Sequence, residues 1–560
     1  MAQGYDTIIL GGGAAGCVLA NRLSARSGHS VLLLEAGQDT PPGAEPADVL
    51  DTYPTSYYNP AYFWPELKVH WRRASNSPLT GYSQGRVMGG GSSVMGMIAL
   101  RGTPDDYAEW QELGAAGWGW DDVLPFFRKI ENDFDFGGEL HGKDGPVPVR
   151  RIPKEQWPPL SRVLEGFASE RQFPFVADMN ADFRDGYCSV PISNWPDKRA
   201  SAAICYLDAS VRARPNLTIM SGTMATGLTF DGRRATGVVA EIGGERREFA
   251  AKEVIVSLGG IHSPVMLMRC GIGPAAHLRQ HGIEVRGDIP GVGANLSNHS
   301  LLFLGFHLKP AARQSHALRS HSATVLRFSS GVPGCPNTDM YINVQSKTSW
   351  SALGRRIANF APSLWKPIGR GRVALNSPDP RREPLVEMNF AGHELDLKRL
   401  MVGFRLAVEM LAFQAVQEIS GVSFPVKFTN RLRELNRRSA SNAAKARAVA
   451  WLTDVLPPLA GPVFSTLADR GTDLIELVKD DEALAEHIRQ NVAGMFHVAG
   501  TCRMGVATDR DAVVDRFGRV RGFDGLRVVD ASIMPTVPRA NTNIPTLMIA
   551  EKISAAMMAG

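Results

Sequence analysis

The chain has 560 residues, of which 44% are hydrophobic and 21% charged, as is typical of a globular protein rather than a disordered or fibrous one. Its formal net charge of +5 comes from 61 basic and 56 acidic residues spread along the whole length, which argues against a nucleic-acid-binding surface. The 6 cysteines are widely spaced and form no CxxC pair, so neither a zinc site nor a disulfide scaffold is expected and a reducing compartment is favoured.

The first predicted element is a buried parallel strand over residues 5–10, almost at the start of the chain. The residues before it are too few for the charged and apolar regions of a secretory signal. No uninterrupted apolar run reaches membrane-spanning length. We therefore expect a cytoplasmic protein, and the length favours two intergrown domains over one.

A glycine-rich turn follows this strand directly and precedes a helical pattern that runs to Leu23. In a strand–turn–helix unit, Gly11 permits the turn, Gly13 lets the backbone approach a pyrophosphate, and Gly16 allows close packing of helix on strand. The helix N-terminus adds unpaired N–H donors for the phosphates. The candidate phosphate-binding residues are Gly11, Gly13, Ala14, Ala15 and Gly16.

The second predicted strand, over residues 30–34, ends at Glu35 and Ala36. A carboxylate at this position can accept hydrogen bonds from both hydroxyls of an adenosine ribose and would repel a 2′-phosphate. The alternative, a flexible glycine loop, is disfavoured because strand, helix and acidic residue are in register. The motif predicts FAD or NAD rather than NADP and leaves the choice between the first two open.

Three later segments follow a pattern and an order found in one enzyme family. They are residues 85–102 (GRVMGGGSSVMGMIALRG), residues 259–273 (GGIHSPVMLMRCGIG) and residues 497–505 (HVAGTCRMG), the last followed by VDASIMPTVPRANTNIPTLMIAEK at 529–552. On these motifs the chain resembles the glucose-methanol-choline (GMC) oxidoreductases over nearly its whole length. It is most similar to their bacterial hydroxymethylfurfural oxidase-like branch.

The resemblance implies an α/β fold with a Rossmann-type FAD-binding domain that is assembled discontinuously. Residues 1–155, 200–312 and 489–560 would form this domain. Residues 156–199 and 313–488 would form an α+β substrate-binding (cap) domain with an antiparallel sheet. Apolar residues recur at helical spacing from Leu397 to Phe413, which predicts a helix within the cap.

The glycine-rich loop of the first family motif is expected near the pyrophosphate and the flavin ring, since glycines let a backbone approach a ligand closely. A plain surface turn is the alternative. By resemblance, the cofactor contacts here are Arg86, Met88, Gly89, Gly91, Ser92, Val94, Met95, Gly96 and Met97. Val94 stands where relatives that tether FAD covalently have a histidine, so non-covalent FAD is expected. Met95 replaces a customary asparagine, which makes the pocket more apolar.

Further cofactor contacts are implied for the middle and the end of the chain. They are Ala225 near the adenine, followed by Asp530, Ala531, Asn541, Thr542 and Pro545. An aspartate at a strand end, such as Asp530, is also a common helix cap.

Oxidation of an alcohol requires a base beside the hydroxyl group and a hydride acceptor facing the carbon, which FAD supplies. Imidazole suits the base, and His497 matches the base of the family. Asn541 matches its hydrogen-bonding partner. Met495, Phe496 and Trp365 are expected to wall the substrate pocket, with plain core packing as an equal alternative. The histidines and carboxylates lack metal-ligand spacing, so no metal is expected.

The predicted reaction is oxidation of a primary alcohol, aromatic or otherwise activated, to the aldehyde. Oxygen or a quinone or cytochrome carrier would accept the electrons. A hydroxynitrile lyase on the same scaffold is the alternative reaction, and a non-enzymatic flavin-binding protein is a third possibility that His497 and Asn541 argue against.

Residues 427–470 carry a basic run beside an apolar one that is broken at Pro457–Pro458. A helical elaboration packed on the cap, or a subunit interface, is favoured over contact with a membrane or an electron-accepting partner. The oligomeric state stays open.

Overall fold

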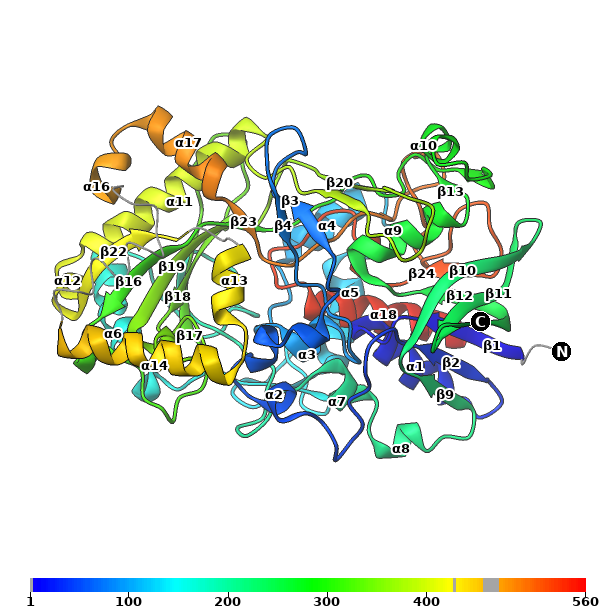
Figure 1. Ribbon diagram of the computed structural model, residues 1–560, viewed down its shortest axis with the longest axis horizontal. Helices are drawn as coiled ribbons and strands as arrows, with labels where there is room; N and C mark the ends of the chain where they lie inside the picture. The colour runs from blue at the N-terminus through cyan, green and yellow to red at the C-terminus, as the bar shows by residue number, and fades with distance from the viewer. Residues whose placement is uncertain (1–3, 427–429, 457–472, 560) are drawn as a thin grey trace.

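The computed structural model describes residues 4–426, 430–456 and 473–559. The protein contains two large sheets, one in each half of the molecule (Figure 1). The described residues before position 427 and after position 472 contribute strands to both sheets, so the chain passes between the two halves several times.

The first sheet is the Rossmann-type sheet predicted from the glycine-rich turn. Its parallel strands lie in the order β9 (Leu217–Met220), β2 (Val31–Leu34), β1 (Gly4–Leu10), β12 (Glu245–Val256) and β24 (Leu526–Val528). Strands β10 (Thr223–Asp231) and β11 (Arg234–Ile242) continue from β12 as an antiparallel meander. Segments from the beginning, middle and end of the chain therefore pair in one sheet, which confirms the discontinuous assembly.

Two buried helices bring the carboxyl-terminal part of the chain to the first turn. They are α1 (Ala14–Ser24) and α18 (Asn543–Ala559), which pack against each other beside this sheet (Figure 1). The carboxylate of Glu551 on α18 is fully buried and pairs with Arg22 on α1 at 2.7 Å and with Lys129 at 2.8 Å. Because α18 begins two residues after Asn541, this packing helps to fix the position of Asn541.

The second sheet forms the cap. Its strand order is β22 (Ser420–Pro425), β16 (Leu304–Leu308), β19 (Ile357–Leu364), β18 (Met340–Gln345), β17 (Ser322–Phe328), β8 (Gly186–Ser189) and β7 (Phe175–Val176), antiparallel except for the last pair. Strands β15 (Ser300–Leu301) and β23 (Ala493–Gly494) pair with each other and extend it beside β19. Strands β15, β16 and β23 therefore belong to the cap sheet, although residues 200–312 and 489–560 were predicted to lie in the FAD-binding domain.

Helices cover the cap sheet. The predicted helix is α11 (Glu394–Ala412), which buries Leu400, Phe404 and Leu411. On another side of the cap lie α13 (Asn430–Asn436) and α14 (Ala440–Val455) (Figure 1). Asp454 of α14 pairs with Arg313 at 2.6 Å and with Arg356 at 2.5 Å, so the described part of the 427–470 segment is a helical elaboration bound to the cap. Its Pro457–Pro458 break and Lys427 lie outside the described residues.

The remaining helices and strands are mostly short. Further helices are α2 (Ala47–Leu50), α3 (Gly91–Val94), α4 (Pro104–Glu112), α5 (Trp120–Ile130), α6 (Pro159–Glu170), α7 (Ala202–Tyr206), α8 (Ala209–Arg212), α9 (Gly259–Arg269), α10 (Ala275–Gln280), α12 (Gln414–Ile419), α16 (Leu474–Leu477) and α17 (Asp481–Asn491). Smaller sheets contain β3 (Lys68–His70), β4 (Leu79–Gly81), β5 (Glu131–Asp133), β6 (Val147–Val149), β13 (Ile272–Gly273), β14 (Gly287–Asp288), β20 (Arg372–Ala374) and β21 (Leu385–Glu387). Over the described ranges, every helix is too short or too polar to cross a membrane.

Candidate active site

One cavity of about 1080 Å³ reaches from the first glycine turn to the cap sheet and to α13. It exceeds the roughly 300–1,000 Å³ of most small-molecule pockets, as a site for a dinucleotide and a substrate together would require. Its walls come from both halves of the molecule.

The three glycines predicted to bind the cofactor, Gly11, Gly13 and Gly16, differ in what their backbone positions allow. Gly11 has a φ of +96°, and a Cβ there would lie 2.5 Å from the carbonyl oxygen of Ser257. A Cβ on Gly16 would lie 1.9 Å from the carbonyl oxygen of Gly11, so this residue holds α1 against the turn without lining the cavity. At Gly13 the nearest protein atom would be 4.0 Å away, and this residue lines the cavity. A ligand could therefore approach the backbone at Gly13.

The start of α1 provides donors at the same place. No side chain caps the helix at Gly13, and Ala14 and Ala15 also line the cavity. The first N–H groups of a helix have no partner within the helix and carry a partial positive charge. This terminus can therefore bind the phosphates of a dinucleotide.

Two buried carboxylates line this end of the cavity. Glu35 is 7% exposed and accepts hydrogen bonds from the backbone N–H groups of Gly12 and Gly37, both at 2.8 Å. Asp530 accepts from the backbone of Gly259 and of Ser532, both at 2.8 Å, and so caps the short turn after β24, as the alternative interpretation anticipated. Burial raises the pKa of both carboxyl groups.

In the loop that carries the first family motif, some of the predicted cofactor residues line the cavity, and others pack behind the loop and support it. Its predicted cofactor residues that line the cavity are Gly91, Ser92, Met95, Gly96 and Met97. Gly89 instead donates its N–H to the carbonyl of Gly12 at 2.6 Å, and Met88 packs against the same turn. Val94 is fully buried in a small core cluster, and the Arg86 guanidinium lies over the Trp64 ring at 4.9 Å. These four support the two loops and are not part of the cavity wall.

Of the other residues predicted to contact the cofactor, some line the cavity and some do not. Ala36, Ala531, Asn541 and Thr542 line the cavity, whereas Ala225 on β10 and Pro545 in the first turn of α18 do not. At the start of α18, Asn543 and Thr546 face the cavity in place of Pro545.

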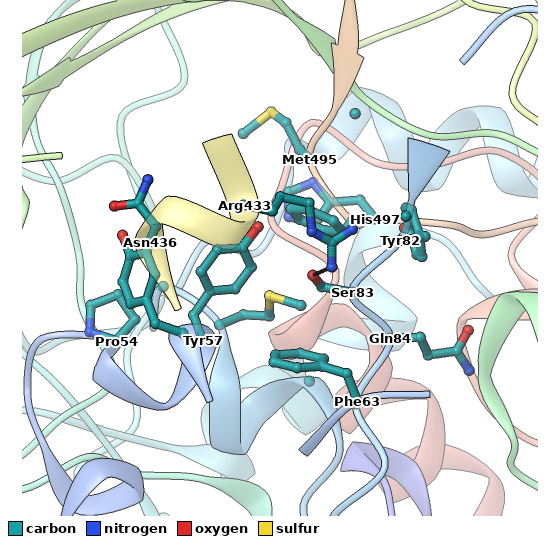
Figure 2. A pocket seen from close by; sticks show the side chains of 18 of the residues that line it. Pro54, Tyr57, Phe63, Tyr82, Ser83, Gln84, Arg433, Asn436, Met495 and His497 are labelled. Carbon is teal, nitrogen blue, oxygen red and sulfur yellow. Dashed lines mark hydrogen bonds between the residues drawn. The ribbon is translucent and has the colours of Figure 1, made fainter. Parts of the chain in front are cut away.

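His497 lies in the cavity wall (Figure 2), and three hydrogen-bonding contacts hold it there. Its backbone N–H donates to Asn298 Oδ1 at 2.9 Å. Its Nδ1 lies 2.8 Å from Nδ1 of His299, and its Nε2 lies 3.1 Å from Nδ2 of Asn541. The ring is 8% exposed, and burial lowers the pKa of His497 to about 3. The imidazole is therefore neutral near pH 7 and can accept a proton.

The backbone just before His497 is in an unusual conformation. Phe496 has a φ of 63°, in the left-handed region that residues other than glycine seldom adopt. Such a conformation costs on the order of 1–3 kcal/mol and often marks a functional site. Met495 and Phe496 both line the cavity, as predicted.

Trp365 does not line the cavity, and its predicted role in the pocket wall is wrong. Its ring stacks on His299 with centroids 4.7 Å apart and on Tyr341 at 4.1 Å. It therefore lies behind the histidine pair and supports His299. The sequence could not indicate this, because the contact joins residues far apart in the chain.

Aromatic residues that the sequence analysis did not single out form much of the wall near His497. Tyr57 and Tyr82 approach the Phe496 ring with centroids 5.8 and 5.0 Å away. The Phe63 ring meets the Tyr57 ring edge to face, with their centroids 6.0 Å apart. Both side chains are shown in Figure 2. The density of aromatic residues between positions 53 and 64 is the signal that could have identified this wall.

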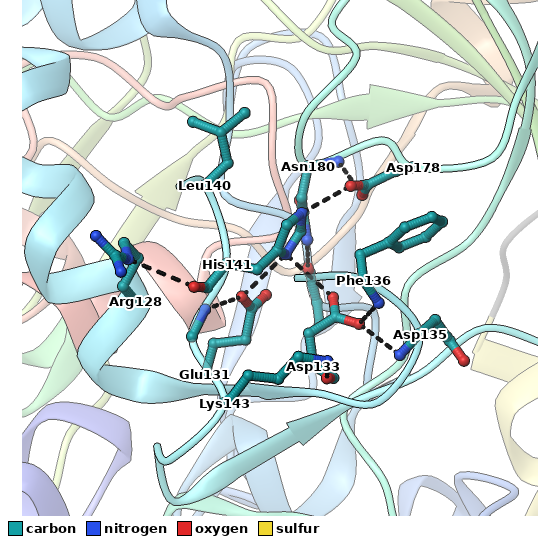
Figure 3. Close-up of polar contacts among 12 residues, drawn as sticks. Arg128, Glu131, Asp133, Asp135, Phe136, Leu140, His141, Lys143, Asp178 and Asn180 are labelled. Atoms are coloured by element: carbon teal, nitrogen blue, oxygen red, sulfur yellow. Dashed lines mark hydrogen bonds and ion pairs between the residues drawn. The ribbon is translucent and has the colours of Figure 1, made fainter. Parts of the chain in front are cut away.

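A separate buried cluster brings together groups that could hold a metal ion (Figure 3). Its members are Glu131, Asp133, His141, Asp178, Arg101 and Arg151. His141 faces carboxylates on both ring nitrogens, with Nε2 2.8 Å from Asp178 and Nδ1 3.1 Å from Glu131. Burial lowers the pKa of His141, but hydrogen bonds to Asp133, Asp178 and Glu131 outweigh this effect and raise it to about 10.

Three carboxylates in this cluster thus face three cationic groups. Arg101 pairs with Glu131, and Arg151 pairs with Asp133 at 2.5 Å and with Asp178 at 2.8 Å. Balanced charges and direct hydrogen bonds are what a buried ion-pair network requires. We therefore interpret the cluster as structural.

A Rossmann-type sheet with an open helix N-terminus, and a neutral histidine in the same cavity, define a dinucleotide-dependent oxidoreductase as the class of protein. Comparison with known proteins agrees. Family models described as GMC oxidoreductase match residues 5–301 and 367–550. The chain belongs to the GMC oxidoreductase family, which confirms an FAD-dependent enzyme that oxidises alcohols.

Individual relatives cover the whole chain. The chain is 39% identical to a 5-(hydroxymethyl)furfural oxidase from Methylovorus sp. (strain MP688), over 99% of this chain and 98% of that protein. It is 30% identical to an oxygen-dependent choline dehydrogenase from Photobacterium profundum, over 99% and 93%. The crystal structure of pyridoxine 4-oxidase from Mesorbium loti superimposes with a TM-score of 0.80 at 24% identity, over 99% of each chain.

Proposed function

We propose that this enzyme oxidises a primary alcohol, attached to an aromatic or otherwise activated group, to the aldehyde. Oxygen or a quinone-like carrier accepts the electrons. The observation that carries the proposal is the pair His497 and Asn541, 3.1 Å apart in the wall of a cavity with an aromatic lining. The name of the relative that is 39% identical, an oxidase of a hydroxymethyl furan, supports the same substrate class.

The residues of the cavity fit non-covalent FAD. The N-terminus of α1 and Gly13 would hold the pyrophosphate, and Glu35 the adenosine ribose. Val94 offers no nucleophile for a covalent link and is buried away from the cavity. When bound, FAD supplies the hydride acceptor of the reaction. Precipitation with acid is expected to release the yellow cofactor into the supernatant, and pellet-bound flavin would contradict non-covalent binding.

His497 is the proposed base. Its hydrogen bonds determine which of the two ring nitrogens can accept the proton. Burial lowers the pKa of both His497 and His299, so both rings are neutral and one proton lies between their Nδ1 atoms. With that proton on His497, its Nε2 keeps a lone pair, which the Asn541 amide N–H groups can face. The opposite tautomer would place two donors against each other. The proposed base atom is therefore Nε2, and His299 is a positioning residue.

Asn541 is the proposed partner that fixes the substrate oxygen. Its Nδ2 can donate a hydrogen bond to the hydroxyl oxygen and stabilise the negative charge that develops there. Its Oδ1 is buried, and no described residue provides a hydrogen bond to it. An alcohol hydroxyl can fill that role before its proton moves to His497.

Anaerobic addition of benzyl alcohol to the holoenzyme tests this function. We expect bleaching of the oxidised flavin band and one equivalent of benzaldehyde per flavin. Re-oxidation by oxygen and by a quinone, measured separately, then identifies the acceptor. An unchanged spectrum across a panel of alcohols, together with cleavage of a cyanohydrin, would contradict the proposal and indicate a lyase.

A further inference from the structure

The part of the cavity wall that α13 forms includes a cation that no described residue neutralises. Arg433, on α13, extends toward Ser83 (Figure 2), and Tyr82 and His497 line the same cavity. Its Nη2 donates to Ser83 Oγ at 3.0 Å. Its Nη1 is buried and has no hydrogen-bond partner among the described residues. None of the ion pairs between described residues includes Arg433.

A guanidinium nitrogen shielded from water without an acceptor is unfavourable, and buried polar groups in native proteins nearly always find a partner. A ligand is the partner that a cavity can supply. The planar fork of arginine matches the two oxygens of a carboxylate, and a charge-assisted hydrogen bond of this kind is stronger than a neutral one. Arg433 therefore points to an anionic group on the ligand.

Most other charged groups at this end of the cavity are also positive. Lys347, Arg437 and Lys445 line it together with Arg433. The carboxylate of Glu434 also lines it, but this group pairs with Arg437 at 3.0 Å instead of with Arg433. The local field at this end therefore attracts an anion and would repel a cationic alcohol.

A short series of contacts connects Arg433 to the proposed base. Ser83, which binds Arg433, follows Tyr82 in the chain, and the Tyr82 ring lies 5.0 Å from that of Phe496. Phe496 directly precedes His497. The space between the guanidinium and the imidazole is thus walled by aromatic rings, which suit a flat ring in the substrate.

From this arrangement we infer that the preferred substrates are aromatic alcohols that carry a carboxylate, with the hydroxymethyl group at His497 and the carboxylate at Arg433. The inference rests on the proposed function, because it names the substrate class of the same site. Arg433 acts as a specificity-determining residue and takes no part in the proton or hydride transfer.

The test compares 4-(hydroxymethyl)benzoate with its methyl ester, which has the same reacting group and no charge. In the wild-type holoenzyme we expect kcat/KM for the acid to exceed that for the ester. In Arg433→Met we expect kcat/KM for the acid to fall by about 10- to 100-fold, mainly through KM, and that for the ester to change less than about threefold. Arg438→Met, which removes an exposed guanidinium from the same segment of chain but outside this cavity, is the matched control.

Binding of benzoate and of neutral benzamide, measured by calorimetry on the same holoenzymes, separates this inference from the proposed function. Benzoate binding that is lost in Arg433→Met and kept in Arg438→Met supports the inference even if no alcohol is oxidised. Equal affinity for benzoate in wild type and Arg433→Met would overturn it, even if benzyl alcohol is oxidised well. Loss of FAD from Arg433→Met would also overturn it, because Arg433 would then belong to the cofactor site.

Discussion

At the residue scale, the neutral state of His497 sets the expected pH dependence. Burial lowers the pKa of His497 to about 3, so the proposed base would lose its function only when the pH falls toward that value. We expect kcat/KM for benzyl alcohol to stay nearly constant from about pH 8 to about pH 5, whereas a histidine of ordinary pKa would lose about tenfold per unit below about pH 6.5. A steady-state pH profile tests this, and a decline that begins near pH 6.5 would contradict it.

Asn541 offers a second prediction at this scale. Its replacement by alanine removes the proposed donor for the substrate oxygen, and we expect the rate of flavin reduction to fall by about 100-fold with FAD still bound. Asn541→His restores a donor and is expected to recover most of this rate. Stopped-flow reduction measures both variants. Equal rates for wild type and Asn541→Ala would remove Asn541 from the mechanism.

At the element scale, the turn between β1 and α1 can be tested by the space around its glycines. The protein atom nearest to a Cβ on Gly13 would be 4.0 Å away. The Gly13→Ala variant should therefore fold normally, and its methyl group would lie in the cavity. We expect at least about tenfold weaker FAD binding, measured by titration of the apoprotein. Gly28→Ala, at an exposed position with no atom within 4 Å, is the control. Unchanged FAD affinity in Gly13→Ala would place the pyrophosphate elsewhere.

The same turn shows why one part of the dinucleotide site could be predicted from the sequence. The turn of β1 and α1 depends on local glycine chemistry, and Glu35 on a short spacing, so both could be recognised. Strand β16 could not be assigned to a sheet, because its partners β19 and β22 lie more than 40 residues away. For the same reason His299 was missed, since its contact with His497 spans 198 residues.

Within the predicted site, the resemblance identified motifs more accurately than it identified which side chains face the cavity. Met88 and Val94 lie within the correct loop but point into the core. Trp365 is aromatic and close to the site, yet it stacks behind His299. The direction of a side chain depends on tertiary packing, which a motif does not contain.

At the scale of the whole molecule, the buried network around His141 links stability to pH. The pKa of His141 in the folded protein, about 10, exceeds its ordinary value of 6.5, so its contribution is present in full below about pH 6.5 and is lost as the pH rises toward 10. We expect the unfolding free energy of wild type to decrease over this interval by up to about 1 kcal/mol per pH unit more than that of His141→Asn. Urea unfolding of the holoenzymes from pH 7 to 10 measures this difference.

His281→Asn, a substitution at the end of α10 and outside this network, is the control and should keep the wild-type dependence on pH. Parallel curves for wild type and His141→Asn would show that the network does not hold a proton in this range.

The central claim is that a neutral imidazole at position 497 accepts the proton of the alcohol. Anaerobic stopped-flow reduction by benzyl alcohol, compared between wild type and His497→Ala, tests it most directly. We expect the variant to retain FAD and to be reduced at least about 100-fold more slowly, the usual contribution of a general base. Reduction of His497→Ala at the wild-type rate would contradict the claim.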